Sequence, residues 1–463
     1  MKKYIFIIVC FLNIGIAFPQ TIEIKIKNLE NKKAYISSLN GEKVTLIDSV
    51  NAITKEKFQF NLDNPKYHTG FYRLSFDKNN QSRLGRAQTE WIDFVNDDEN
   101  VSIITNANKV LDSLYIVDSE SNKLFYSFLK LNKAYKTKTE LLQLILARYP
   151  QDDVYYKTTQ KRLTQLQNEY IELVNVTAQK KPQSFIAKYI RSAQLPVVDI
   201  SIPIDKQLAY LKSHALDNVD FNNSLLIDSD VFTNKTIEYL TYYRNPQLPL
   251  ELLEKEFMVA VDSILNRAKV NQLVYQHIVE YLIDGFKKFG FDKILDYIVE
   301  SYVIKDDLCL DVKTEGLIKR RIDQAKFLKI GNSVPEIVLP DVNGKQMELN
   351  KIKSEKVLIV FYTSWCPHCK ELLPKLNELY ITLRENKIKV LAVSLDSKKD
   401  DWQNFTNANC QSLINVSDLK GWEGKAATDY FIYATPTMFL VDRDKKIIRK
   451  PMTVDNVKGL LKE

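Results

Sequence analysis

The sequence predicts a multi-domain protein in which an antiparallel β domain is followed by an all-α domain and then by an α/β domain. Three observations lead to this prediction. Apolar and polar residues alternate near the N-terminus, as they do in half-buried strands. The chain then contains no glycine between Gly85 and Gly285, where apolar residues instead recur with helical spacing. A continuous apolar run at residues 357–362 is typical of a strand buried on both faces.

Length and composition exclude several classes of protein. At 463 residues the chain is too long for a single hydrophobic core. Its 45% hydrophobic and 27% charged residues are typical of a globular protein rather than a disordered or multi-span membrane protein. The net charge of +7 is spread along the chain without a basic block, so the sequence indicates no nucleic-acid partner.

Residues 1–19 predict a secretory signal peptide. Two lysines precede an apolar run at residues 4–18, and small residues near its end place the cleavage site between Ala17 and Gln20. The run is shorter than the roughly 20 residues of a membrane-spanning helix, so we expect no stable membrane span after cleavage. The alternative is a retained N-terminal anchor.

The antiparallel β domain is predicted at residues 20–108. Ile22, Ile24 and Ile26 alternate with polar residues, as in a strand with one buried face. The dipeptide Asn40-Gly41 precedes another strand pattern and is a strong hairpin signal. Further strand-like runs follow at residues 58–62, 71–76, 91–95 and 101–104. Together they predict a small sheet or sandwich.

The all-α domain is predicted at residues 109–329. One helical face is formed by Leu163, Leu166, Tyr170, Leu173 and Val174. The α/β domain is predicted at residues 330–463. Its strand patterns lie at 333–349 (a pair with a turn at Asn343-Gly344), 357–362, 388–396, 437–442 and 445–450, with helical patterns between and after them. That order predicts a mixed central sheet.

The cysteines predict a redox pair rather than a structural framework. Of five cysteines, Cys10 lies in the predicted signal peptide, and Cys309 and Cys410 are assigned to buried packing positions. Cys366 and Cys369 form the one close pair. A disulfide-stabilised scaffold of this length would contain many more cysteines, so this pair is predicted to be redox-active.

The position of the pair at the start of a helix predicts its chemistry. Pro367 suits the first helical position, and leucines 372, 376, 379 and 383 mark one face of the helix that follows. Cys366 therefore lies at the helix N-terminus, where the dipole and free amides stabilise a thiolate and lower its pKa. His368 can add positive charge or a hydrogen bond, and the inward-facing Cys369 is the expected resolving thiol.

Other uses of two such cysteines fit less well. A c-type haem needs a histidine directly after the second cysteine, where Lys370 stands. Structural zinc needs four ligands, and the chain has no second pair of this spacing. We expect no metal and no cofactor besides the disulfide that the pair itself can form. A thiol peroxidase is the stronger alternative because Thr363 fits such sites, although Ile359 replaces their proline.

The run "FYTSWCPHCK", followed by Pro374 and later by "YATPT", resembles the thioredoxin superfamily. The preceding run "VPEIVLPDVNGKQMEL" narrows the resemblance to the TlpA/ResA-like thiol-disulfide oxidoreductases, which are exported bacterial proteins. The resemblance covers residues 330–463. More weakly, residues 21–106 resemble the small β domain found ahead of such modules in Gram-negative bacteria. The resemblance implies that the protein is located in the periplasm or cell envelope.

The resemblance also implies a substrate-binding surface. It implies a cis peptide bond between Thr435 and Pro436, which would present the backbone of Thr435 beside Cys366. An extended substrate segment could pair there as an added strand. Trp365 and Pro367 would offer apolar contacts. Trp422 either borders the same face or packs on the core as an ordinary loop residue.

The implied reaction is thiol–disulfide exchange with a protein substrate and with a thiol-disulfide electron donor or acceptor. The reducing direction is favoured, although the Pro-His dipeptide resembles that of strongly oxidising enzymes. The sequence departs from the family at two acids: Val360 replaces a buried aspartate and Pro340 replaces a glutamate. Water, His368 or another acid must then manage the Cys369 proton. The functional alternative is a binding or scaffold protein of the cell envelope with an accessory thioredoxin module.

Overall fold

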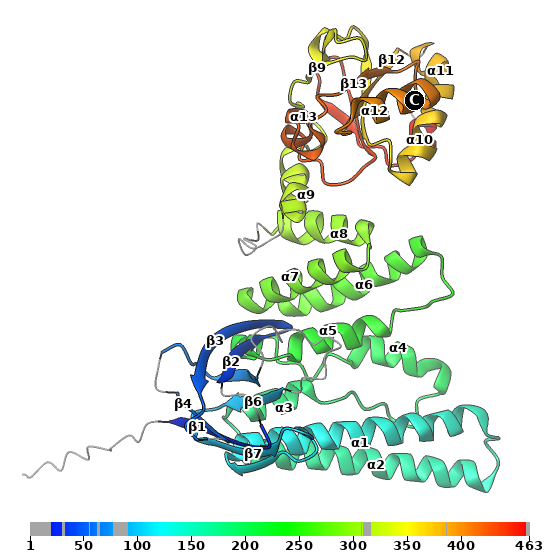
Figure 1. Cartoon of the computed structure of the whole chain (residues 1–463). Coiled ribbons are helices and arrows are strands. Elements are labelled where there is room, and N and C mark those ends of the chain that lie inside the picture. The colour runs from blue at the N-terminus through cyan, green and yellow to red at the C-terminus, as the bar shows by residue number, and fades with distance from the viewer. Residues whose placement is uncertain are drawn as a thin grey trace, which may run out of the picture. The chain divides into compact units, whose positions relative to one another are not determined.

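The computed structural model describes most of the chain. The described residues are 20–29, 33–54, 56–62, 65–76, 91–306, 308, 316–385 and 387–459. The chain divides into two compact units, Met1–Leu282 and Ile283–Glu463, and the division falls within helix α7 (Gln272–Lys288). Many of the elements of both units are labelled in Figure 1.

Some sequence predictions fall on residues outside this description. The predicted signal peptide at residues 1–19 is one of them, and Cys10 and Cys309 are others. Among the helices of the described residues, none combines the length and apolarity that crossing a membrane requires.

The first unit begins with two four-stranded β-sheets (Figure 1). One sheet has the strand order β4-β1-β7-β8 and the other has the order β3-β2-β5-β6. The strands are β1 (Thr21–Lys27), β2 (Lys33–Asn40), β3 (Lys43–Asn51), β4 (Lys57–Asn61), β5 (Gly70–Ser75), β6 (Ile92–Asn96), β7 (Val101–Asn106) and β8 (Tyr115–Asp118). The predicted N-terminal β region is therefore confirmed.

The two sheets share one apolar core, which makes them a sandwich. Ile22, Ile24 and Ile26 of β1 are fully buried, as their alternation predicts. They belong to the same cluster as Tyr72 and Phe94 of the other sheet.

These sheets differ from the prediction in two details, the direction of one strand pair and the residue at which the β region ends. The hairpin at Asn40-Gly41 is present, with Gly41 at a φ of 59° and Asn40 opposite Lys43. However, β1 and β7 pair in parallel, so the sheet is not wholly antiparallel. Strand β8 also extends the sheet to Asp118, beyond the predicted boundary at residue 108.

The rest of the first unit is helical, as predicted. It contains α1 (Glu120–Arg148), α2 (Val154–Gln179), α3 (Phe185–Ala193), α4 (Ile204–His214), the 3₁₀ turn η1 (Ser224–Asp228), α5 (Val231–Thr241), α6 (Leu250–Ala268) and the first part of α7. On α2 the predicted apolar face is buried at four positions, Leu163, Leu166, Tyr170 and Val174. Leu173 is 49% exposed instead, because α1 and α3 cover only part of that face.

The second unit opens with helical elements that the sequence assigns to the all-α domain. They are α8 (Asp292–Ile298), the π-helix η2 (Val299–Ile304) and α9 (Gly316–Phe327). The predicted boundary at residue 329 separates them from the α/β domain. The structure groups them with the α/β domain in one compact unit instead.

The α/β domain is built on a five-stranded sheet of order β13-β12-β11-β14-β15. Its strands are β11 (Lys356–Tyr362), β12 (Ile388–Ser394), β13 (Ile414–Val416), β14 (Thr437–Val441) and β15 (Ile447–Arg449), and a hairpin of β9 (Val338–Pro340) and β10 (Gln346–Glu348) precedes them. Strand β11 pairs in parallel with β12 and antiparallel with β14. The predicted mixed sheet is therefore present.

Strand β11 is buried on both faces, as its continuous apolar run predicts. Leu358, Val360 and Tyr362 point into one apolar cluster. Val357, Ile359 and Phe361 point into another. The strand is therefore a rigid base for the loop that follows it.

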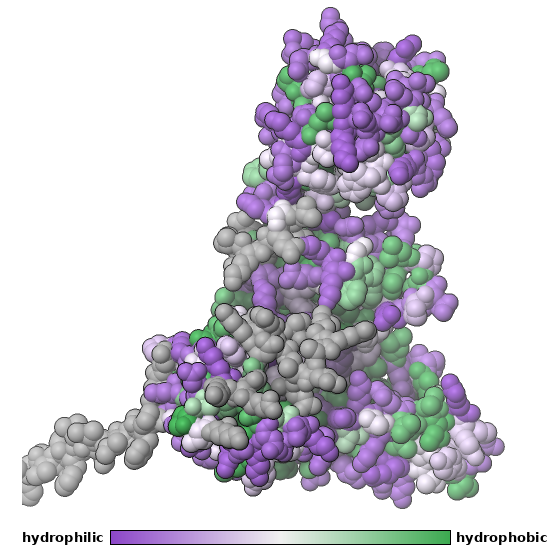
Figure 2. All heavy atoms as spheres, in the orientation of Figure 1, coloured by the Kyte–Doolittle hydropathy of each residue, from purple (hydrophilic) through white to green (hydrophobic). Residues whose placement is uncertain are grey.

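On the face of this domain that Figure 2 shows, most residues are hydrophilic, and helices cover the sheet. They are α10 (Pro367–Glu378), α11 (Tyr380–Glu385), α12 (Lys399–Asn409), α13 (Lys425–Asp429) and α14 (Val454–Gly459), with 3₁₀ turns η3 (Leu349–Lys351) and η4 (Gly421–Glu423). The single helix predicted after Cys366 divides at Leu379 into α10 and α11.

Candidate active site

The loop between β11 and α10 carries the cysteine pair. Tyr362 ends β11, and α10 begins at Pro367 with Cys366 as its N-cap. Asp396, which is 2% exposed, anchors this loop from the end of the neighbouring strand β12. Its carboxylate accepts hydrogen bonds from the Ser364 backbone N–H at 3.1 and 3.2 Å and from the Ser364 hydroxyl at 2.9 Å. The backbone directly before Cys366 is thereby fixed.

Cys366 is a free thiol at the edge of the apolar core. The residue is 6% exposed, and its Sγ donates to the Thr435 carbonyl oxygen at 3.3 Å. Burial raises the pKa of this thiol, but hydrogen bonds from the backbone and thiol of Cys369, from Thr435 and from the backbone of His368 outweigh it, so the pKa lies below its ordinary value. A lowered pKa favours the thiolate, which is the nucleophilic form.

Cys369 lies beneath Cys366 and is fully buried. Burial chiefly raises the pKa of Cys369 to about 12, and the nearby Cys366 adds to the increase. The two thiols therefore differ in ionisation although they share one loop. Cys366 is suited to attack, and Cys369 is suited to remain protonated until a partner sulfur is presented to it.

The segment opposite the pair contains the expected cis peptide bond. The Thr435–Pro436 bond is cis, which confirms the prediction. The Thr435 hydroxyl lies 3.5 Å from the Thr363 hydroxyl, while its carbonyl oxygen accepts from Cys366. Thr435 and Pro436 are both partly exposed beside the buried thiols. They therefore border the cysteine pair where the domain meets its surface.

Three other predicted site residues lie on the surface around Cys366. Trp365 is 61% exposed, and Pro367 and His368 are exposed as well. In the described part of the chain, the His368 ring forms no hydrogen bond with Cys366. Its backbone N–H is the group that contributes to the lowered pKa of that thiol. Together, Trp365, Pro367 and His368 form an exposed rim beside the cysteine sulfur.

The two positions where the family acids are replaced remain without an acid. Val360 is fully buried in the same apolar cluster as both cysteines. Pro340 ends the short strand β9. Among the described residues, no carboxylate forms a hydrogen bond with Cys369.

The remaining candidates take packing roles in the described chain. Trp422 is partly buried and packs on the core cluster of one sheet face. Cys410 is a fully buried free thiol. Among the described residues, no group of three or more histidine, cysteine, aspartate or glutamate side chains is placed to hold a metal ion.

Sequence reasoning missed Asp396 as part of the site. Its signal was its position at the end of a predicted strand, because the carboxyl ends of parallel strands meet at one edge of a sheet. Strand β12 is the parallel neighbour of β11, so Asp396 and the cysteine loop meet there.

The chain is similar to several known proteins. Residues 330–450 match the AhpC/TSA family. The thiol-disulfide oxidoreductase ResA of Bacillus thuringiensis (strain Al Hakam) is 30% identical over 139 residues, which cover 29% of this chain and 79% of that protein. The thioredoxin domain of a thiol-disulfide oxidoreductase from Bacteroides vulgatus is 25% identical, with a TM-score of 0.28, and covers 29% of this chain and 96% of its own. A thioredoxin-like protein from Bacteroides caccae ATCC 43185 is 22% identical, with a TM-score of 0.37, and covers 58% of this chain and 97% of its own.

Proposed function

We propose that the chain, which belongs through its C-terminal domain to the ResA-like thiol-disulfide oxidoreductases of the thioredoxin superfamily, is an exported enzyme that exchanges thiols and disulfides of substrate proteins through Cys366 and Cys369. The observation that supports this assignment is the contrast between the two thiols. Cys366 has a lowered pKa beside the partly exposed Thr435, whereas the fully buried Cys369 has a pKa of about 12.

The proposed reaction has two steps. The Cys366 thiolate attacks one sulfur of a substrate disulfide, so that a mixed disulfide forms and the other substrate sulfur leaves as a thiolate that takes a proton. Cys369 then loses its proton and attacks the Cys366 sulfur. The substrate is released as a dithiol, reduced by two electrons, and the enzyme keeps the Cys366–Cys369 disulfide. A protein dithiol must reduce that disulfide before the next turnover.

We propose that the physiological direction is reduction of substrates. A strong oxidant of this fold owes its potential to a strongly stabilised thiolate. The leading groups that lower the pKa of Cys366 are hydrogen-bond donors of Cys369, Thr435 and the His368 backbone. None of these is a full positive charge, which supports a moderate rather than a strongly oxidising potential. A measured reduction potential close to about −120 mV, the oxidant end of the range, would overturn this assignment.

The location that we propose is the periplasm or cell envelope. The support is the signal-peptide pattern of residues 1–19, with two lysines before an apolar run and small residues at cleavage spacing. Fractionation of cells that express the full chain, with mass measurement of its N-terminus, tests this. Cleavage between Ala17 and Gln20 is the expected result, and an intact chain in the cytoplasm would contradict it.

Trapping of substrates tests the proposed activity directly. In a Cys369→Ala variant the first step proceeds but the mixed disulfide persists, so captured proteins remain covalently bound to Cys366 and are released by an external reductant. Cys410→Ala is the matched control, because Cys410 is also a fully buried free thiol but lies outside the active-site loop. Absence of any trapped protein, together with full biological activity of Cys366→Ala, would favour the scaffold alternative.

The thiol peroxidase alternative has less support in the sequence. Thr363 fits such a site, but Ile359 stands where such sites have a proline. Peroxide consumption through a sulfenic acid at Cys366 would be the contrary result.

A further inference from the structure

Residues 430–433 lead directly into the Thr435–Pro436 bond, and helix α9 holds them by hydrogen bonds. Side chains of α9 donate to three successive backbone carbonyl groups of this segment. The bonds are Arg320 Nη1 to Ile432 (3.3 Å) and Gln324 Nε2 to Tyr430 (3.0 Å) and Phe431 (3.3 Å). Gln324 is 6% exposed, so its bonds are shielded from water. The carbonyl groups of this loop are therefore satisfied by a helix outside the thioredoxin-like sheet domain.

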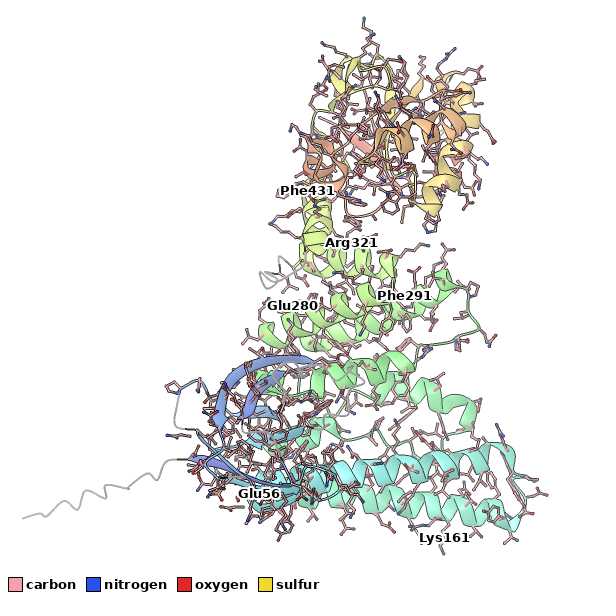
Figure 3. All side chains as sticks on the ribbon, viewed as in Figure 1. Glu56, Lys161, Glu280, Phe291, Arg321 and Phe431 are labelled. Atoms are coloured by element: carbon pink, nitrogen blue, oxygen red, sulfur yellow. The ribbon has the colours of Figure 1, made fainter. Side chains whose placement is uncertain are left out.

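The next residue, Tyr433, is held by its side chain. Its hydroxyl donates to Asp296 Oδ1 on α8 at 3.0 Å. The guanidinium group of Arg321 lies 4.3 Å from the centre of the Tyr433 ring and pairs with Asp296 at 3.2 Å. Arg321 is 5% exposed and also bonds Asp292 at 2.7 Å. Figure 3 labels Arg321 on α9 and Phe431 on the loop that follows α13.

Burial and charge around Asp296 favour a protonated Tyr433 hydroxyl that donates to the Asp296 carboxylate. Burial raises the pKa of Asp296, while the charge of Arg321 and the hydrogen bond from Tyr433 lower it. Burial and the charge of Asp296 raise the pKa of Tyr433, so the phenol stays protonated and donates. Asp292 and Glu300 also face Asp296 and raise its pKa. Loss of the Tyr433 hydroxyl would remove one of the partners that stabilise the partly buried Asp296 carboxylate.

We propose that α8 and α9 act as a positioning support for the substrate-binding loop: by holding residues 430–433, they keep the Thr435 carbonyl against the Cys366 sulfur. The proposal rests on the thiol-disulfide exchange proposed above. It gives α8 and α9, which lie outside the sheet domain, a role in that reaction. Arg321, Gln324 and Tyr433 are positioning residues, because they act on the reacting sulfur through Thr435.

The pattern of contacts distinguishes such a support from simple adhesion of helices to the domain. Adhesion requires only apolar burial, which Leu328, directly after α9, already provides: it is 2% exposed and belongs to a core cluster of the sheet domain. Arg320 also bonds Trp422 and Glu423 on η4, but the other polar bonds fall on four consecutive residues, 430–433, that end two positions before Thr435. The Thr435 carbonyl then lies 3.3 Å from the sulfur, a contact that a displacement of a few tenths of an ångström would weaken.

A Tyr433→Phe variant of the full chain tests this proposal, because it removes one hydroxyl and keeps the ring under Arg321. Tyr67→Phe is the matched control: the Tyr67 hydroxyl donates to Asp48 at 3.0 Å, in the other unit of the chain. Two readouts are needed, namely KM and kcat for a protein disulfide, and the pH midpoint of Cys366 thiolate formation followed by ultraviolet absorbance.

For Tyr433→Phe we expect KM to rise about threefold to tenfold with kcat changed less than about twofold. The thiolate midpoint should move upward, because a displaced Thr435 also loses the side-chain hydrogen bond that lowers the pKa of Cys366. Tyr67→Phe should leave all three quantities at the wild-type values. Gln324→Leu is the second variant and should shift KM and the midpoint in the same direction.

Wild-type values of KM and midpoint in both Tyr433→Phe and Gln324→Leu would overturn the proposal, as would equal changes in Tyr67→Phe. The thiolate midpoint needs no turnover. If the wild-type protein fails to reduce disulfides, the proposed function fails, while the midpoint still decides whether α8 and α9 position the loop.

Discussion

Release of the substrate by Cys369 should depend steeply on pH. Cys369 is fully buried, and burial is the main reason why its pKa is about 12. Only the thiolate attacks a disulfide, so the rate of this step follows the ionised fraction of Cys369. At pH 7 the pKa exceeds the pH by about 5 units, so about one Cys369 in 10⁵ is ionised.

The rate of release should rise with pH, because the pH lies below the pKa of Cys369. Throughout the range from pH 6 to 9 the pH lies below the pKa of Cys369, so each added pH unit increases the thiolate about tenfold. In the mixed disulfide Cys366 carries no ionisable thiol, so its contribution to the raised pKa of Cys369 is lost. The contribution of burial remains, and Val360 beneath the pair is fully buried and offers no base. The rate of release should therefore rise about tenfold per pH unit.

A quenched single-turnover experiment measures this rate. Reduced protein is mixed with excess peptide disulfide, stopped with acid at successive times, and the mixed disulfide at Cys366 is quantified by mass spectrometry. Cys369→Ala serves as the control in which the intermediate should persist at every pH. A decay rate that stays constant between pH 6 and 9 would refute the reasoning, because it would require a base that takes the Cys369 proton.

Two further predictions concern other buried groups. Burial, and to a smaller extent the charge of Lys43, lowers the pKa of His277 to about 4. Between about pH 6.5 and pH 4, His277 is therefore protonated in the unfolded chain but not in the folded chain. The free energy of unfolding should therefore fall as the pH falls through that window, by at most about 3 kcal/mol, and thermal melts of His277→Gln should lack this decrease. Asp396→Ala should lower kcat/KM for a protein disulfide about tenfold by releasing the backbone N–H of Ser364; an unchanged kcat/KM in a folded variant would contradict the anchoring role.

The cysteine pair could be predicted from the sequence because its signals are local. The apolar run of β11, Pro367 at the first helical position and the spacing of Cys366 and Cys369 all lie within one short segment. Local patterns determine which residue begins a helix and which face it buries. The lowered pKa expected for Cys366 follows from the same segment, together with Thr435.

Features that depend on contacts distant along the chain could not be predicted in the same way. The parallel pairing of β1 with β7 joins segments with similar alternation, and alternation does not specify a partner or its direction. The sequence also did not predict that α8 and α9 belong to the second unit. Helical periodicity indicates which face of a helix is apolar, but not which core that face packs against. Arg321 and Gln324 are charged or polar residues that the pattern places in solvent, yet they are 5% and 6% exposed.

These distant contacts hold the reacting groups from two sides. Asp396 fixes Ser364 ahead of Cys366, and α9 with α8 fixes residues 430–433 ahead of Thr435. The 3.3 Å contact between the Cys366 sulfur and the Thr435 carbonyl is therefore the meeting point of two independently anchored segments. Each anchor is a buried polar group whose partners lie in another element, so neither segment can shift without leaving hydrogen bonds unmade. It follows that the nucleophile owes its environment to the helices before the sheet domain as well as to the cysteine loop itself.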